Sequence, residues 1–169
     1  MFVRWHPERM FLLVAGYNIL NTGDDWAMYE LVSDSLVRRG SSNWAANSPG
    51  TKMFEWSLRR TGTANYYAFS FEDDLYIGEF NEGTDWNKTV TAASVSSIGT
   101  NINGLDWSPS GTSVALACEN GTLKIYAFSG SALTLKDSVD LGTTLTAVTW
   151  SADGNYIVTG GTGPGANYE

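Results

Sequence analysis

The chain has one histidine, His6, and one cysteine, Cys118, so side chains that commonly carry nucleophilic chemistry are scarce. A nucleophilic triad sets a histidine between a serine or cysteine and a carboxylate, and a zinc site combines several cysteine and histidine ligands. His6 lies in a polar turn that three similar segments fill with Ser57, Ser108 and Ser151, which favours a structural residue on a surface turn. Cys118 ends an apolar segment, which favours a buried and inert thiol. We therefore predict no catalytic residue, no metal site and no cofactor.

Acidic residues recur at one position of the sequence pattern. Asp24-Asp25 and Asp73-Asp74 follow similar apolar segments, and Glu119 takes that place in the next one. Aspartate caps tight turns by hydrogen-bonding to nearby backbone, so these residues fit turn chemistry. They also fit an acidic rim that binds a basic partner, or oxygen ligands of a divalent cation. No calcium-loop pattern supports the cation, and the turn and the rim remain alternatives.

Three tryptophans stand outside the repeated pattern described below. Trp26 aligns with Leu75 and Leu123 and is predicted to lie in the core. Trp44 and Trp86 lie in polar, loop-like contexts. Exposed tryptophans of this kind are candidate contacts for a protein or a sugar. The alternative is that both pack beneath long loops.

The composition limits the kinds of partner. Ten Lys and Arg against 18 Asp and Glu leave a net charge of −8, which argues against a nucleic-acid partner. The longest apolar run, Met10 to Ala15, is far short of the roughly 20 residues that cross a membrane. Arg4 and Arg9 precede it as in a signal peptide, but the run belongs to a repeat. We expect a protein made without its own export signal, located in the cytoplasm or within a particle such as a virion.

The elements that must position these residues form a repeat marked by tryptophan. Trp5, Trp56, Trp107 and Trp150 each end a short apolar segment and precede a polar turn, with spacings of 56 − 5 = 51, 107 − 56 = 51 and 150 − 107 = 43 residues. Periods of about 40 to 50 residues are typical of propeller blades with four strands. Alternating apolar runs separated by turn residues follow each tryptophan, as in a β-meander. The sequence therefore predicts an all-β, propeller-like array of four-stranded antiparallel blades with these tryptophans in its core.

One stretch carries a family resemblance. Leu105-Asp106-Trp107-Ser108-Pro109-Ser110-Gly111, then Val114-Ala115-Leu116-Ala117, then Asn120-Gly121-Thr122-Leu123-Lys124-Ile125-Tyr126 resembles a WD40 repeat, and Val148 to Gly160 resembles the first half of the next one. The resemblance is fainter over 1–100. Tyr126-Ala127 replaces the usual Trp-Asp pair, and no Gly-His pair precedes a first strand. The resemblance implies a β-propeller with second-to-third-strand turns and blade-joining loops on one face.

The repeats do not close a ring. We expect one propeller-like domain over 1–169, with repeats at about 1–51, 52–102 and 103–145 and a partial one at 146–169. A closed propeller has four to eight blades, and an open strand edge promotes association. Other protein chains are therefore expected to complete or cover the array, as an oligomer or part of a larger assembly. The alternative is a truncated piece of a longer propeller.

Two functions from different classes follow. The first is a non-catalytic interaction or assembly module, plausibly a structural component of a virion or another large assembly, with partner contacts at Asp24, Asp25, Trp44, Asp73, Asp74, Trp86 and Glu119. The second is a sugar-binding or glycan-processing propeller that uses carboxylates such as Asp24, Asp73 and Asp106. Glycoside hydrolysis requires two carboxylates about 5 to 9 Å apart over a cleft.

Overall fold

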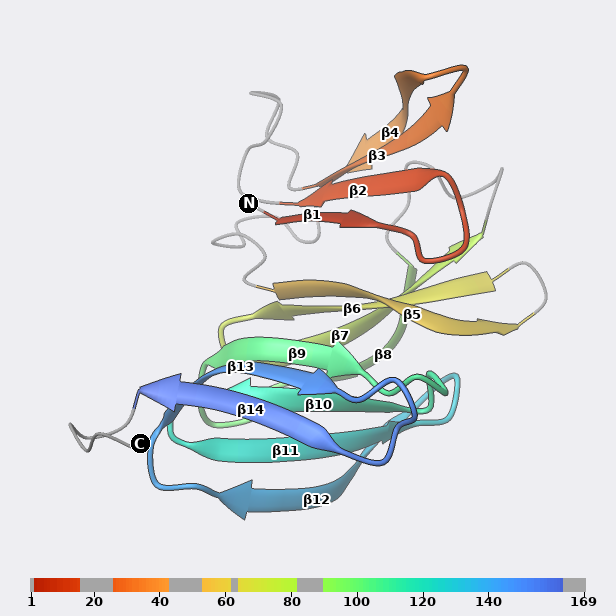
Figure 1. Cartoon of the computed structure of the whole chain (residues 1–169). Helices are drawn as coiled ribbons and strands as arrows, with labels where there is room; N and C mark the ends of the chain where they lie inside the picture. The colour runs from red at the N-terminus through yellow and green to blue at the C-terminus, as the bar shows by residue number, and fades with distance from the viewer. Residues whose placement is uncertain (1, 16–25, 43–52, 62–63, 82–89, 163–169) are drawn as a thin grey trace.

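The computed structural model describes residues 2–15, 26–42, 53–61, 64–81 and 90–162, and these form four antiparallel sheets (Figure 1). The first sheet contains β1 (Phe2–Trp5), β2 (Phe11–Ala15), β3 (Trp26–Val32) and β4 (Ser35–Ser42). The second contains β5 (Met53–Thr61), β6 (Ala64–Phe71), β7 (Asp74–Asn81) and β8 (Val90–Val95). The third contains β9 (Ile102–Trp107), β10 (Ser113–Cys118), β11 (Thr122–Phe128) and β12 (Leu133–Asp140), and the fourth pairs β13 (Thr144–Trp150) with β14 (Ile157–Thr162).

Each sheet is a meander in which strands pair in chain order, and the described residues contain no helix. Accordingly, the described part of the chain has no helix that is long and apolar enough to cross a membrane. The prediction of an all-β array of four-stranded blades is confirmed, with two strands in the last sheet.

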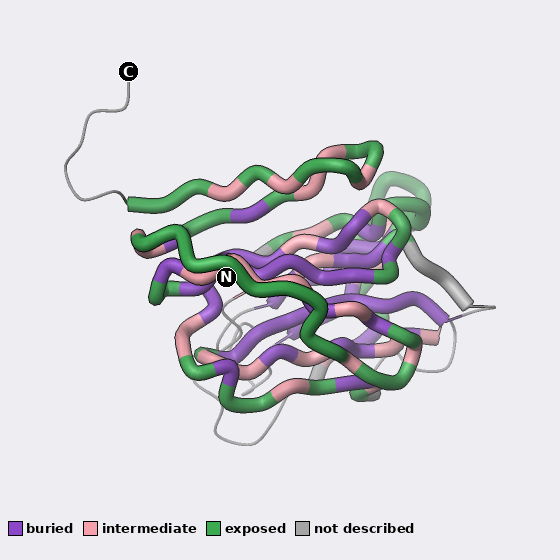
Figure 2. Tube along the Cα trace, turned by 90° about the horizontal axis from the view of Figure 1, so that it is seen from below, coloured by how far each residue is buried: buried purple, intermediate pink, exposed green. Residues whose placement is uncertain are grey.

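Residue alternation builds the cores between the sheets. All eight residues of β6 are buried, and the strand's period of two sends them to opposite faces. Tyr67, Phe69 and Phe71 pack in the cluster between the first and second sheets, whereas Tyr66 and Ala68 pack in the cluster shared with the third. Figure 2 shows this buried interior and the exposed terminal strand that leads to the C-terminus. A strand buried on both faces therefore explains the nearly continuous aromatic and apolar run of β6.

Turn chemistry closes the connections between first and second strands. Ser108 Oγ accepts a hydrogen bond from Ser113 N at 3.0 Å, and Ser151 Oγ accepts one from Tyr156 N at 2.9 Å. Asp153 accepts from the Ser151 hydroxyl and from Asn155, and these hydrogen bonds, led by that of Ser151, lower the pKa of Asp153. The repeated serine thus closes equivalent turns.

The repeated tryptophans occupy equivalent places but differ in burial. Each tryptophan lies on the first strand of its sheet and pairs with a residue of the second strand. The exposed fraction is 7 % for Trp56 and 5 % for Trp107. Trp150 is partly buried, and Trp5 is 50 % exposed. The prediction that Trp5 is a core residue is therefore wrong. The first sheet packs against the second, and no other described sheet covers the outer side of β1.

His6 also departs from its predicted environment. Its exposed fraction is only 4 %, and its ring lies edge-on to Trp56 with centroids 4.9 Å apart. Glu8 N donates to His6 Nδ1 at 3.1 Å, which leaves His6 Nε2 to donate to Asn65 Oδ1 at 3.0 Å. The predicted surface position of His6 is therefore wrong, because its ring is packed between the first and second sheets.

Two further predictions of burial are confirmed. Trp26 lies in the core of the first sheet. Cys118 is buried at the end of β10, and burial raises the pKa of its thiol. Since the thiolate is the reactive form, both burial and the raised pKa oppose its chemistry.

The difference between the repeated tryptophans predicts unequal losses of stability. Trp107→Ala should lower the free energy of unfolding by about 3 to 5 kcal/mol, because a large side chain leaves a packed core. Trp5→Ala should cost less than about 1 kcal/mol, because half of this side chain is already in water. Urea unfolding of both variants measures the difference, and equal losses would contradict this description of the core.

The burial of Cys118 predicts a thiol that is protected by the fold. A disulfide reagent such as dithionitrobenzoate should modify Cys118 much more slowly in the native protein than in urea. Modification at the same rate in both conditions would show that β10 is accessible in the native state.

Candidate functional site

The structure describes three of the seven residues predicted to contact a partner. Asp73 and Glu119 lie in turns between second and third strands, and Asp74 begins β7 directly after such a turn. Asp24, Asp25, Trp44 and Trp86 lie outside the described residues.

These turns join the blade-joining loops in one surface. Ile98 N donates to Asp73 O at 2.9 Å, and Ile102 N donates to Glu72 O at 2.8 Å. On the other side of the same loop, Glu119 N donates to Asn101 O at 2.9 Å. Leu141 N in turn donates to Gly121 O at 2.9 Å. We call the surface formed by 72–74, 96–101, 119–121 and 140–143 the loop face.

Two of the predicted carboxylates also hold the loops in place. Asp74 Oδ1 accepts from Ser97 N at 2.9 Å, and Asp74 Oδ2 accepts from the Tyr76 hydroxyl at 3.1 Å. Burial, and then the bond and charge of Asp74, raise the pKa of Tyr76. The Glu119 carboxylate accepts from Asn101 Nδ2. Asp74 and Glu119 thus perform the turn chemistry that their residue types indicated.

The charge of the loop face is strongly one-sided. Its acidic side chains are Glu72, Asp73, Asp74, Glu119 and Asp140, and each is exposed or partly exposed. Among the described residues, Lys124 is the basic side chain that reaches this face. Its Nζ donates a hydrogen bond to Ile98 O at 2.9 Å. The described part of the loop face therefore carries a clear excess of negative charge.

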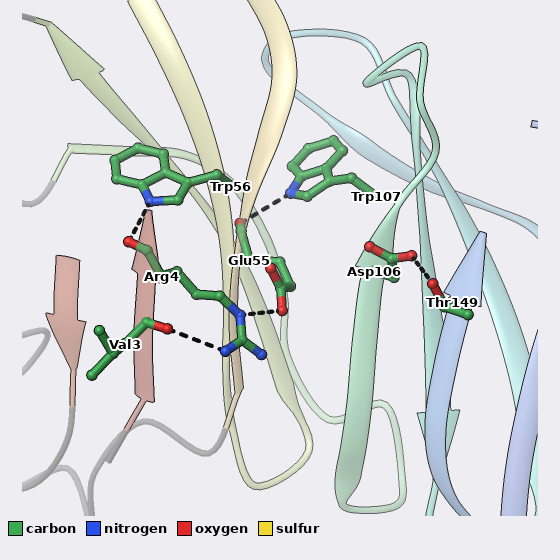
Figure 3. Close-up of polar contacts among 7 residues, drawn as sticks. All are labelled: Val3, Arg4, Glu55, Trp56, Asp106, Trp107 and Thr149. Atoms are coloured by element: carbon green, nitrogen blue, oxygen red, sulfur yellow. Dashed lines mark hydrogen bonds and ion pairs between the residues drawn. The ribbon is translucent and has the colours of Figure 1, made fainter. Parts of the chain in front are cut away.

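A second arrangement, which was not predicted from the sequence, links the first strands of successive sheets. Trp56 Nε1 donates to Arg4 O at 3.4 Å, and Trp107 Nε1 donates to Glu55 O at 3.3 Å (Figure 3). Each acceptor lies just before the tryptophan of the preceding sheet. We call these bonds the tryptophan ladder. The constant spacing of 51 residues was its sequence signal.

Side chains at the position before each tryptophan reinforce the ladder. Arg4 Nε pairs with Glu55 Oε1 at 2.5 Å. Asp106 Oδ2 accepts from Thr149 Oγ1 at 3.0 Å and from Trp150 N at 2.7 Å. The ladder itself stops there, because Trp150 Nε1 is buried with no hydrogen-bond partner among the described residues.

A cavity of about 310 Å³ lies at the end of these strands. Its walls include Trp5, Trp56, Trp107 and Trp150, and Glu55 and Asp106 also line it. Burial raises the pKa of Glu55, Arg4 acts in the opposite direction, and the negative charge of Asp106 raises it further. Two carboxylates therefore act on each other within an aromatic pocket.

The described residues contain no cluster of three or more histidine, cysteine, aspartate or glutamate side chains that could hold a metal ion. What the geometry provides is an acidic loop face at one end of the sheets and an aromatic, acidic cavity at the other.

Comparison with known proteins bears on the fold and the repeats. The family model described as "WD domain, G-beta repeat" matches residues 87–127 and 134–163. No curated protein sequence matches the chain.

A WD40 propeller in the solved structure described as "Crystal Structure of Mitotic Checkpoint Complex" has a TM-score of 0.67 and 17 % sequence identity. The alignment covers 94 % of this chain and 46 % of that chain, so this chain spans about half the length of its structural neighbour. Residues 87–127 and 134–163 therefore match WD40 repeats, and the fold of the described residues is a β-propeller-like array with three four-stranded blades and part of another.

Proposed function

We propose that the chain is a non-catalytic interaction or assembly module that binds a basic protein surface through its loop face. The observation that carries this proposal is the continuous acidic surface formed by the turns at 72–74 and 119–121 and the loops between and beside them. Complementary charge speeds protein association and selects among partners.

Rigidity supports the proposal as well as charge. The backbone bonds from Ile98, Ile102 and Glu119 tie the blade-joining loop to both neighbouring turns. Asp74 fixes the same loop through Ser97 N. A surface whose loops are already ordered loses less conformational freedom when a partner binds.

The fold supports an interaction role too. The structural neighbour belongs to a structure whose title names a multi-protein complex. We extend the proposal to other protein chains that complete or cover the array of blades. A virion location stays a prediction from sequence composition.

The glycan-processing alternative gains no support from Asp73 and Asp106, the two described carboxylates that it named. Asp73 lies beside the start of β9, whereas Asp106 lies near its end. The start of β9 and Asp106 are four residues apart along an extended strand, which separates Asp73 and Asp106 by about 13 Å along the strand direction. Two hydrolytic carboxylates must lie closer than this. Asp24, the third residue of that hypothesis, lies outside the described residues.

The proposal predicts that charge on the loop face controls binding to a basic probe. The variant Glu72→Gln, Asp73→Asn, Glu119→Gln keeps the side-chain shapes and leaves Asp74 to hold its loop. Its affinity for a fluorescent lysine-rich peptide should fall by roughly fivefold, since exposed charges contribute a few tenths of a kcal/mol each. Fluorescence polarisation measures the affinity, and added salt should weaken binding to the native protein.

A matched variant separates the loop face from net charge. Glu8→Gln, Asp34→Asn, Asp137→Asn removes the same number of charges away from the loop face, in the β1–β2 connection, the β3–β4 turn and β12. This variant should bind the peptide nearly as well as the native protein. Equal losses in the two variants would reject the loop face as the binding surface.

A further inference from the structure

The cavity at the far end of the first strands has features that the loop-face function does not use. It is lined by residues at the ends of β1, β9 and β13 and in the middle of β5, and none of the turn residues 72–74 or 119–121 lines it. Figure 1 shows these four strands side by side. Its volume of about 310 Å³ is at the lower limit for sites of small ligands. The space therefore suits one side chain or a compact organic group better than a large cofactor.

The charge of the cavity is unbalanced. Glu55 is paired with Arg4 on one side (Figure 3). Asp106 receives hydrogen bonds from the Thr149 hydroxyl and from Trp150 N, which are both neutral donors. No ion pair involving Asp106 is found among the described residues. The cavity thus has a negative charge left without a cation.

The walls are aromatic and partly preorganised. Trp56 and Trp107 are buried and held by the tryptophan ladder, so their rings are fixed without a ligand. Trp5 is half exposed and Trp150 partly exposed, which leaves aromatic surface accessible at both sides. A cation over the face of an indole is stabilised by the ring's negative electrostatic potential, and tryptophan is the strongest such partner.

We propose that this cavity binds the guanidinium group of an arginine side chain from a partner peptide. Asp106 supplies the counter-charge, and Trp5 and Trp150 supply the walls against which the planar group stacks. Guanidinium is favoured because it is planar, weakly hydrated and able to bond a carboxylate while it stacks on an aromatic ring. The two carboxylates would repel a phosphate or another anion.

The test uses a ligand pair that differs in charge but hardly in shape. N-acetyl-arginine methylamide is titrated against the nitrogen-15-labelled protein to concentrations on the order of 10 mM, and the uncharged citrulline analogue is the control. The readout is the set of indole N–H resonances. The arginine compound should shift those of Trp5 and Trp150, and the citrulline compound should have little effect.

Two variants locate the interaction. Asp106→Asn retains an acceptor for Thr149 and Trp150 but removes the charge, and should weaken arginine binding by roughly fivefold. Trp5→Leu changes a half-exposed side chain at the cavity wall and should weaken binding about two- to fivefold. Asp137→Asn, a matched charge change on β12, should leave the affinity unchanged.

Three outcomes would overturn the proposal. The first is the absence of indole shifts with the arginine compound, and the second is equal shifts with citrulline. The third is an equal loss of affinity in Asp106→Asn and Asp137→Asn. If Asp106→Asn does not fold, the Trp5→Leu variant decides. Arginine binding to Trp5→Leu with the affinity of the native protein would reject the aromatic site.

Discussion

The interaction on which the rest of the structure depends is the contact between a tryptophan of one sheet and the first strand of the sheet before it. Trp56 reaches Arg4 O, and Trp107 reaches Glu55 O, at nearly the same distance. A hydrogen bond of this kind contributes about 0.5 to 1.5 kcal/mol, whereas burial of the ring contributes several times more. Packing therefore supplies most of the stability, and the directional bond sets how far one blade is shifted along the next.

That constraint explains why the two ends of the sheets differ chemically. At one end, the tryptophans of four first strands line a cavity, and Glu55 and Asp106 come within electrostatic reach of each other. At the other end, the same alignment places each second-to-third-strand turn beside a blade-joining loop. The acidic residues of those turns then form one surface although they are far apart in the chain.

Much of this fold could be predicted from the spacing of the tryptophans and the period of two in the strands. The burial of Trp5 and His6 could not, because a repeat pattern describes an average blade. Trp5 occupies the same register as Trp107 but lacks a described sheet on its outer side, and His6 replaces a serine but fills a space beside Trp56. The turn positions of Asp73, Asp74 and Glu119 followed from residue type. The pairing of Arg4 with Glu55 joins different blades and leaves no local signal in the sequence.

The central claim, that successive blades are registered by indole hydrogen bonds, is tested most directly by hydrogen exchange at the tryptophan side chains. The Nε1–H protons of Trp56 and Trp107 should exchange with solvent much more slowly than that of Trp5, because the first two are buried and bonded to a neighbouring strand. Exchange at Trp107 as fast as at Trp5 in the native protein would contradict the ladder and the blade alignment that depends on it.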